Sequence, residues 1–112
     1  MNNRLKFEKQ VGWAVGINDK DALLGYFVSD TKYDVQEVIT KLENVQKEEK
    51  TFEEVLDHPQ VSWDYGEGSG ILDCDKETAY FIADSESNLP NMQMPLKELI
   101  EILYEWKMFL DK

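Results

Sequence analysis

Cysteine, histidine, proline and basic residues are all scarce in this sequence of 112 residues. Its single cysteine, Cys74, excludes an internal disulfide framework and any cysteine-rich zinc module. No uninterrupted apolar stretch exceeds a few residues, so no segment is long enough to span a bilayer. The opening residues, 1–8, contain no apolar signal-peptide region, so we expect a cytoplasmic protein of a bacterial type.

Acidic residues dominate the charge. There are 23 Asp and Glu against 12 Lys and Arg, which gives a formal net charge of −11. A chain this acidic is repelled by the phosphate backbone, which argues against direct binding to nucleic acid. Apolar residues make up 42% and aromatic residues 12%, too much for a disordered acidic tail. Length and composition together predict one compact domain over residues 1–112.

The first part of the chain has the pattern of β structure. Within residues 5–17 apolar side chains alternate with polar ones, which predicts a strand with one buried face. A polar turn over residues 18–21 precedes a second apolar run, residues 22–28. We therefore expect these two runs to pair as an antiparallel hairpin.

A helix is predicted next, with Asp34 as its N-cap and an apolar stripe that extends to Val45. Thr51 and Glu54 have the spacing of a capping box and predict a short second helix. Pro59 should end this helix near Asp57, because a residue that precedes proline avoids the helical region.

Strand patterns return over residues 61–65, 71–74 and 78–83, and predict a three-stranded meander. Residues 85–94 are expected to form a loop, and Pro95 suits the first turn of a final amphipathic helix. The fold class is α+β, in the order β-β-α-(α)-β-β-β-α. We expect a mostly antiparallel sheet of about five strands with two or three helices packed on one face. Trp13, Trp63 and Trp106 are expected to anchor the core.

The negative charge is concentrated in the middle of the chain. Residues 1–42 carry six acids and six bases, whereas residues 43–86 carry thirteen acids against three lysines. Many of these acids fall in and around the predicted meander, where neighbouring strands would hold them about 5 Å apart. Like charges held together destabilise a fold, and are better tolerated where a basic partner binds. The alternative is a solvated surface that only maintains solubility.

An acidic face complementary to the groove of a nucleic-acid-binding protein would act as a decoy, with carboxylates in place of phosphates. Tyr65, Tyr80 or Trp63 would supply the aromatic anchors of such an interface. A cation site is a weaker alternative. Residues 73–77 open with the acid spacing of a calcium loop, but Thr78 stands where the turn needs glycine. We expect no metal and no cofactor.

Catalysis has little support in the sequence. His58 is the only imidazole, and nothing marks a nucleophile beside it. The acids on either side of Cys74 would raise the pKa of its thiol, so a buried structural role is expected. The glycines at positions 66, 68 and 70 lack the Lys-Ser/Thr of a phosphate-binding loop and are expected in a hairpin turn. We expect no catalytic residues and no enzyme activity.

Three segments carry a resemblance to a known class of proteins: residues 63–73 (WDYGEGSGILD), 78–84 (TAYFIAD) and 94–107 (MPLKELIEILYEWK). With its small, acidic α+β character, the chain resembles the immunity proteins of bacterial polymorphic toxin and contact-dependent growth inhibition systems. The resemblance implies a cytoplasmic protein that binds and neutralises a cognate toxin domain, often a nuclease. It identifies no interface residue, because each immunity protein builds its own.

Partner-binding residues are therefore nominated from charge and position alone, as a set that would meet the basic surface of the toxin: Glu53, Glu54, Asp57, Asp64, Tyr65, Glu67, Asp73 and Asp75. Two other functions remain open. One is an acidic adaptor or regulatory domain without a toxin partner, and the other is a small hydrolase.

Overall fold

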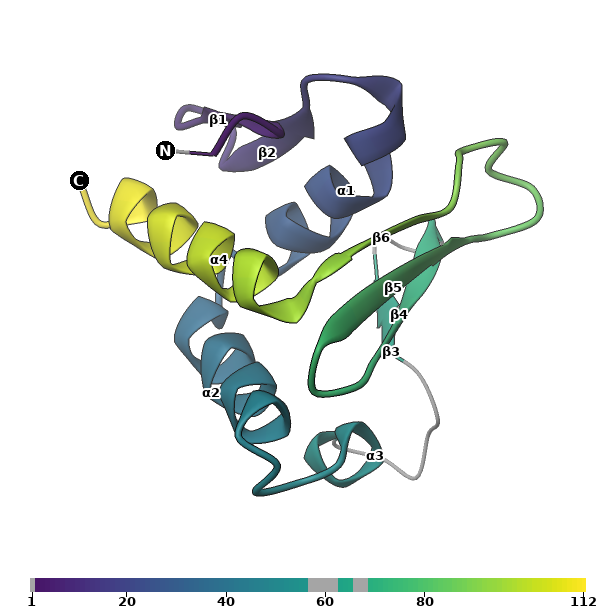
Figure 1. Cartoon of the computed structure of the whole chain (residues 1–112). Coiled ribbons are helices and arrows are strands. Elements are labelled where there is room, and N and C mark those ends of the chain that lie inside the picture. The colour runs from purple at the N-terminus through teal and green to yellow at the C-terminus, as the bar shows by residue number, and fades with distance from the viewer. Residues whose placement is uncertain (1, 57–62, 66–68) are drawn as a thin grey trace.

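A computed structural model describes residues 2–56, 63–65 and 69–112. These residues form an α+β fold with six strands in two antiparallel sheets and four helices, in the order β-β-α-α-α-β-β-β-β-α (Figure 1). The elements are β1 Leu5–Glu8, β2 Trp13–Gly16, α1 Ala22–Asp30, α2 Val35–Gln46, α3 Phe52–Val55, β3 Trp63–Tyr65, β4 Gly70–Cys74, β5 Thr78–Ala83, β6 Met92–Pro95 and α4 Leu96–Leu110. The predicted α+β class and antiparallel pairing are confirmed.

The N-terminal hairpin differs from the prediction. β1 and β2 pair with each other, so the chain reverses within residues 5–17 instead of forming one long strand. The reversal uses Gly12, whose φ of 66° lies in the left-handed region that glycine adopts at no steric cost. Residues 22–28, predicted as the second strand, begin α1 instead. A short apolar run buried on most sides has no periodicity that separates strand from helix, which is why the pattern failed here.

α2 and α3 follow the prediction closely. α2 begins directly after Asp34, as predicted, although the Asp34 side chain makes no capping hydrogen bond, and its apolar stripe is buried through Val45. At the start of α3 the Thr51 hydroxyl accepts a hydrogen bond from the Glu54 backbone N–H, and the Glu54 carboxylate accepts one from the Thr51 N–H. This reciprocal pair is the predicted capping box.

The second sheet has four strands in the order β3-β4-β5-β6. The three predicted strands are present, and β6 extends the meander where a loop was expected. Met94 of β6 pairs with Ala79 of β5, and Met92 pairs with Phe81. The two methionines thereby turn their side chains toward the core. A strand of four residues with one proline is too short to show its periodicity in the sequence.

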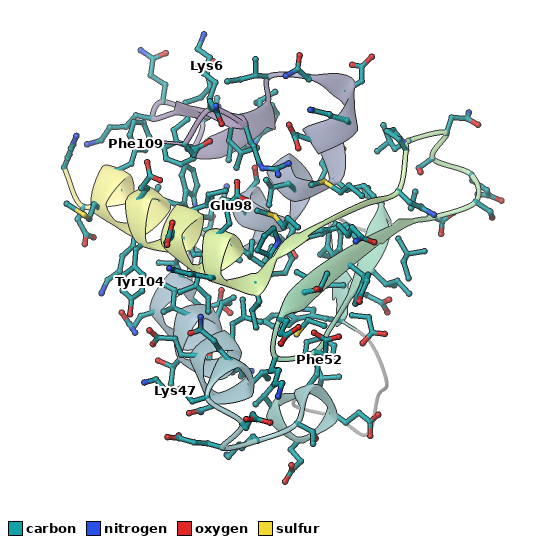
Figure 2. All side chains as sticks on the ribbon, viewed as in Figure 1. Lys6, Lys47, Phe52, Glu98, Tyr104 and Phe109 are labelled. Carbon is teal, nitrogen blue, oxygen red and sulfur yellow. The ribbon has the colours of Figure 1, made fainter. Side chains whose placement is uncertain are left out.

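Helices α1, α2 and α4 lie on one side of this sheet and enclose the core with it (Figure 1). The core contains fully buried Phe27, Phe81 and Trp106. Phe109 stacks on Trp106 with a centroid separation of 5.9 Å, and Tyr104 on the same helix donates a 2.9 Å hydrogen bond to Glu43 of α2 (Figure 2). The expectation that helices pack on one face of the sheet agrees with this arrangement.

The three tryptophans differ in their environments. Trp106 is fully buried, and Trp63 is partly buried and packs against the core beside Phe27. Trp13 was also predicted in the core, but 55% of it is exposed. The reason is that Ala14, its neighbour in β2, faces α1, so the alternating set that includes Trp13 points outward. None of the helices among the described residues is both long and apolar enough to cross a membrane.

Candidate functional site

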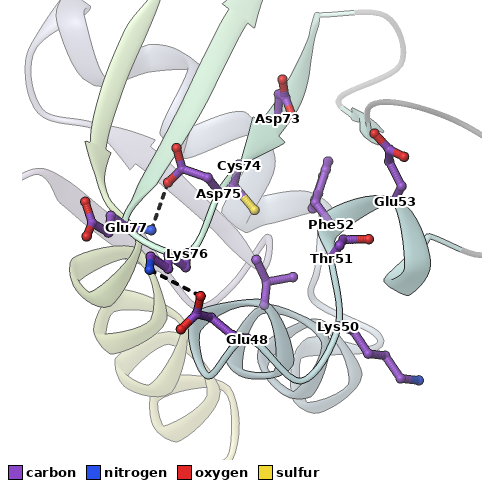
Figure 3. A pocket seen from close by; sticks show the side chains of 11 residues that line it. Glu48, Lys50, Thr51, Phe52, Glu53, Asp73, Cys74, Asp75, Lys76 and Glu77 are labelled. Atoms are coloured by element: carbon purple, nitrogen blue, oxygen red, sulfur yellow. Dashed lines mark hydrogen bonds and ion pairs between the residues drawn. The ribbon is translucent and has the colours of Figure 1, made fainter.

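A groove of about 620 Å³ runs between the connection from α2 to α3 and the turn from β4 to β5. Figure 3 shows its lining. Apolar side chains form one part of the lining, namely those of Val45, Phe52 and Cys74, whereas the rest is polar or charged. The charged lining residues are Glu48, Lys50, Glu53, Asp73, Asp75, Lys76 and Glu77. With five acids and two lysines, the lining has an acidic excess.

Local backbone structure positions both walls. On one wall, α2 ends in a tight turn in which Glu48 has a φ of 60°, and the capping box then starts α3. On the other wall, Asp75 Oδ1 accepts hydrogen bonds of 2.8 Å from the backbone N–H groups of Glu77 and Thr78. These two bonds close the turn from β4 to β5 and lower the pKa of Asp75 below its ordinary value.

One ion pair connects the two walls. Lys76 Nζ lies 3.2 Å from Glu48 Oε1, and both side chains are more than half exposed (Figure 3). An exposed pair of this kind contributes only about 0–1 kcal/mol to stability. Its main electrostatic consequence is that Glu48 and Lys76 neutralise each other. Among the described residues, Glu53, Asp73 and Glu77 then have no ion-pair partner.

The outer side of the four-stranded sheet continues the groove through Asp73. In β4 the side chains of Leu72 and Cys74 are buried, whereas Asp73 is exposed and Ile71 is partly exposed on the opposite side. The register places Asp64 opposite Ile71, Ile71 opposite Ile82, and Asp73 opposite Tyr80. Asp64 and Asp73 are thus diagonal neighbours, a relation that separates residues by roughly 7–8 Å. The carboxylates of Asp64 and Asp73 thus flank a small apolar strip that Ile71 and Ile82 form.

We call this surface the acidic face. It combines the outer side of the sheet with the adjoining acids of the groove, and consists of Asp64, Ile71, Asp73, Tyr80, Ile82, Glu53 and Glu77. Ile82 is 41% exposed, and no described helix lies over this side of the sheet (Figure 1). An uncovered apolar strip bordered by carboxylates without ion-pair partners is typical of a surface that meets another molecule.

Three of the nominated partner-binding residues, Glu53, Asp73 and Asp75, line the groove, and Asp64 lies on the adjoining sheet. Glu54 is exposed, but its carboxylate serves the capping box, and those hydrogen bonds lower its pKa. Asp57 and Glu67 lie outside the described residues. So does His58, the imidazole considered for catalysis.

Tyr65 was nominated as a surface anchor, and the structure corrects this assignment. Only 2% of Tyr65 is exposed, and its ring packs edge-on against Phe27 and Phe81. Burial also raises the pKa of its hydroxyl above the ordinary value. Strand alternation explains the difference, because Tyr65 and Trp63 share the inner face whereas Asp64 takes the outer one. Tyr80, the other tyrosine considered as an anchor, lies on the acidic face.

Cys74 is buried, as predicted, with 7% of its surface exposed. Burial is the largest cause that raises the pKa of its thiol to about 12, and the charges of Asp73 and Asp75 add to it. The thiolate is the nucleophilic form, so this thiol is poorly suited to covalent chemistry near neutral pH. Within the described residues, no group of three or more His, Cys, Asp or Glu side chains is arranged to hold a metal ion.

Ile71 and Ile82 were not expected on this surface, and Glu77 was expected among the acids of the meander but was not nominated as a partner-binding residue. Ile71 and Asp73 are two residues apart in one strand, so the alternation already placed them on the same side. The side that would be left uncovered was not visible in the sequence, because that depends on where the helices pack. No family model matches the chain, and no curated protein or solved structure matches it either.

Proposed function

We propose that this protein is an immunity protein that acts in the cytoplasm, where it binds a cognate toxin domain with a basic surface and blocks it. The observation that carries the proposal is the acidic face. Among the described residues, its carboxylates Asp64 and Asp73 have no ion-pair partner and border the apolar strip of Ile71 and Ile82. The resemblance of residues 61–107 to immunity proteins supports the same function.

Binding, rather than catalysis, follows from the chemistry of this surface. A basic groove that normally holds a nucleic acid recognises regularly spaced negative charges. Carboxylates on a rigid sheet present such charges without a scissile bond, so they occupy the groove and are not turned over. Tyr80 and the two isoleucines supply the desolvated contacts that hold a complex together, while the acids steer the encounter.

The test uses two double variants that change the net charge equally. Asp64→Lys with Asp73→Lys reverses two charges on the acidic face. Glu37→Lys with Glu101→Lys reverses two exposed charges on α2 and α4. Each protein is immobilised, exposed to lysate of the source cell, and the retained proteins are identified by mass spectrometry. We expect the wild type and the α2/α4 variant to retain the same basic protein, and the acidic-face variant to lose it.

The retained protein is then purified and assayed for cleavage of plasmid DNA and transfer RNA. Immunity function requires that the wild type inhibits this activity at a one-to-one ratio. At 50 mM NaCl the acidic-face variant should associate at least about tenfold more slowly, because charge mainly sets the association rate. Equal association by both double variants would remove the acidic face from the proposal. A retained partner without inhibition would favour the adaptor function. If the protein, immobilised at micromolar concentration, retains nothing, the acidic residues only maintain solubility.

A further inference from the structure

A second surface, remote from the acidic face, exposes large apolar side chains. Trp13 and Val15 project outward from β2 and are 55% and 46% exposed. Tyr26 of α1 is 48% exposed, and Tyr33, just beyond that helix, is 90% exposed. All four line one groove of about 790 Å³ between β2 and α1. We call these four residues the apolar patch.

Close packing of two backbones forms the floor of this groove. A Cβ atom on Gly25 of α1 would lie 2.9 Å from the backbone nitrogen of Gly16 and 3.0 Å from the carbonyl oxygen of Ala14. Only glycine at position 25 therefore lets α1 and β2 come this near. The hollow lies between the larger side chains of Trp13 and Tyr26, and Tyr33 stands at its rim as a projecting ring. One surface thus carries both a hollow and a projection.

The patch is not suited to binding a partner through strand addition. Ser29 of α1 uses its hydroxyl to accept a hydrogen bond from the Ala14 N–H (2.8 Å) and to donate one to the Ala14 carbonyl (2.9 Å). Those backbone groups of β2 are already satisfied, so an incoming strand cannot pair with them. A partner must therefore bind through the exposed side chains.

The charge around the apolar patch favours a second copy of this chain over a basic toxin as the partner. The charged residues that line the groove are Asp19, Asp30 and Lys32, and residues 1–42 as a whole carry no net charge. The acidic groove lies at the other end of the molecule, next to α3 (Figure 1). A strongly basic toxin has no electrostatic reason to choose the neutral patch. For a second copy of the chain, by contrast, this is the region where two molecules of charge −11 approach with little repulsion.

Geometry supports the same partner. In a two-fold dimer each patch faces itself, so the residues of one copy must complement those of the other. Tyr33 of one copy has the hollow beside Trp13 of the other available to it, and the lining carries charges of both signs, Lys32 as well as Asp19 and Asp30. With extents of 35 × 34 × 22 Å, the molecule is several Debye lengths long at physiological salt, about 8 Å each. Repulsion between the distant acidic ends is therefore screened.

The exposed aromatic side chains supply a large part of the area that a dimer interface needs. Aromatic side chains bury about 150–250 Å² each, so the exposed parts of Trp13, Tyr26 and Tyr33 offer roughly 400 Å². That is about half of the roughly 800 Å² that each partner contributes to an interface of standard size, before Val15 and neighbouring residues are added. We propose that the apolar patch is the interface of a two-fold homodimer of this chain. The acidic faces remain exposed at the outer ends, so the dimer would hold two independent sites for a partner.

The experiment is sedimentation equilibrium of the full chain between 1 and 200 µM at 150 mM NaCl, a range chosen to bracket a micromolar dimer. The variants are Tyr33→Lys and Val15→Lys, both at exposed positions. The matched control is Met108→Lys, which places the same charge at an apolar residue of α4 that is 67% exposed. Circular dichroism checks that all four proteins are folded.

We expect the wild type and Met108→Lys to dimerise with dissociation constants within about twofold of each other. Tyr33→Lys and Val15→Lys should each raise the constant at least tenfold, because a buried lysine without a partner is costly. Raising NaCl to 500 mM should leave wild-type dimerisation unchanged or strengthen it, the opposite of the salt response expected for toxin binding. A wild type that is monomeric at 200 µM overturns the proposal. A dimer that both patch variants preserve overturns it as well.

Discussion

Arg4 and Asp21 form an ion pair that connects β1 to the turn before α1. Arg4 Nη1 lies 2.8 Å from Asp21 Oδ1, and only 1% of Asp21 is exposed. The same guanidinium contacts Glu98 of α4 through Nε, also at 2.8 Å. Hydrogen bonds to Glu98 and Asp21 raise the pKa of Arg4 above its ordinary value. One arginine thus connects the N-terminal hairpin, the turn before α1 and the C-terminal helix.

Removal of Arg4 should be strongly destabilising. Arg4→Ala leaves the Asp21 carboxylate buried without its counter-charge, and we expect the free energy of unfolding to fall by about 3 kcal/mol. Urea denaturation followed by circular dichroism measures this loss. The control is Lys6→Ala. It removes a cation two residues along the chain, in β1, whose ion pair with Glu8 is exposed and 3.5 Å long. A loss no larger than that of the control would show that Asp21 does not depend on Arg4.

Gly25→Ala should destabilise the protein, although alanine is the better helix former. The added Cβ would lie 2.9 Å from the backbone nitrogen of Gly16, and backbone atoms cannot move aside as a flexible side chain does. We expect a loss of about 1–3 kcal/mol by urea denaturation. Asp30→Ala, at an exposed position of the same helix, serves as the control for helix propensity. An increase in stability for Gly25→Ala would mean that α1 and β2 are not in close contact.

The capping box of α3 predicts both a stability change and a pH dependence. Thr51→Ala should lower the free energy of unfolding by about 1 kcal/mol, because it removes the hydroxyl that accepts from the Glu54 N–H. The pKa of Glu54 is lowered in the folded state by its hydrogen bonds to Thr51. The contribution of Glu54 to the free energy of unfolding is therefore present above the ordinary glutamate pKa. It is lost as the pH falls through the lowered pKa of the folded state.

Glu54→Gln is the matched variant for that pH dependence. It should show a smaller loss of stability than the wild type as the pH is lowered from 6 to 3. Urea denaturation at each pH gives the comparison. Identical curves for the two proteins would indicate that Glu54 does not hold its carboxylate at the helix start.

Cys74 should resist thiol reagents in the native protein. Burial raises the pKa of its thiol to about 12, so the folded state favours the neutral form. Ellman's reagent at pH 8 should therefore react slowly with the native protein and at once in 6 M urea. Rapid reaction of the native protein would contradict the burial of the thiol.

The same shift predicts a loss of stability at alkaline pH. The raised pKa of the Cys74 thiol contributes to the free energy of unfolding. This contribution is fully present below the thiol pKa of the unfolded chain, near 9, and is lost as the pH rises toward 12. Relative to Cys74→Ala, the wild type should lose up to about 2–3 kcal/mol between pH 8 and pH 11, since one pKa unit corresponds to about 1.4 kcal/mol. Parallel stability curves for the two proteins would contradict the shift.

Tyr65→Phe tests whether the buried hydroxyl of Tyr65 is unpaired. Its hydroxyl has no hydrogen-bond partner among the described residues, and its ring packs against Phe27. We expect the variant to be as stable as the wild type or more stable, by up to about 1 kcal/mol, because a buried unpaired hydroxyl is removed. A loss of more than 1 kcal/mol would show that the hydroxyl has a partner in the folded protein.

Where interactions between neighbouring residues determine the structure, the sequence was sufficient to predict it. Three features depend only on residues that are close in the sequence: the Thr51–Glu54 capping box, the apolar stripe of α2, and the alternation in β4 and β5. The burial of Cys74 and the location of Asp64 and Asp73 on one outer face follow from that alternation. The α+β class and the concentration of acids around the meander were therefore predictable from sequence alone.

Tertiary packing decided the rest. Residues 22–28 become a helix because α1 is buried between β2 and the second sheet, a placement that an apolar run does not encode by its period. The same packing sends Ala14 inward and Trp13 outward, although alternation marks the two faces of the strand without saying which is covered. Likewise, the acidic face is open because all the large helices pack on the other side of the sheet. A local pattern specifies which residues share a face, but only the assembled elements determine which face meets the core and which meets solvent.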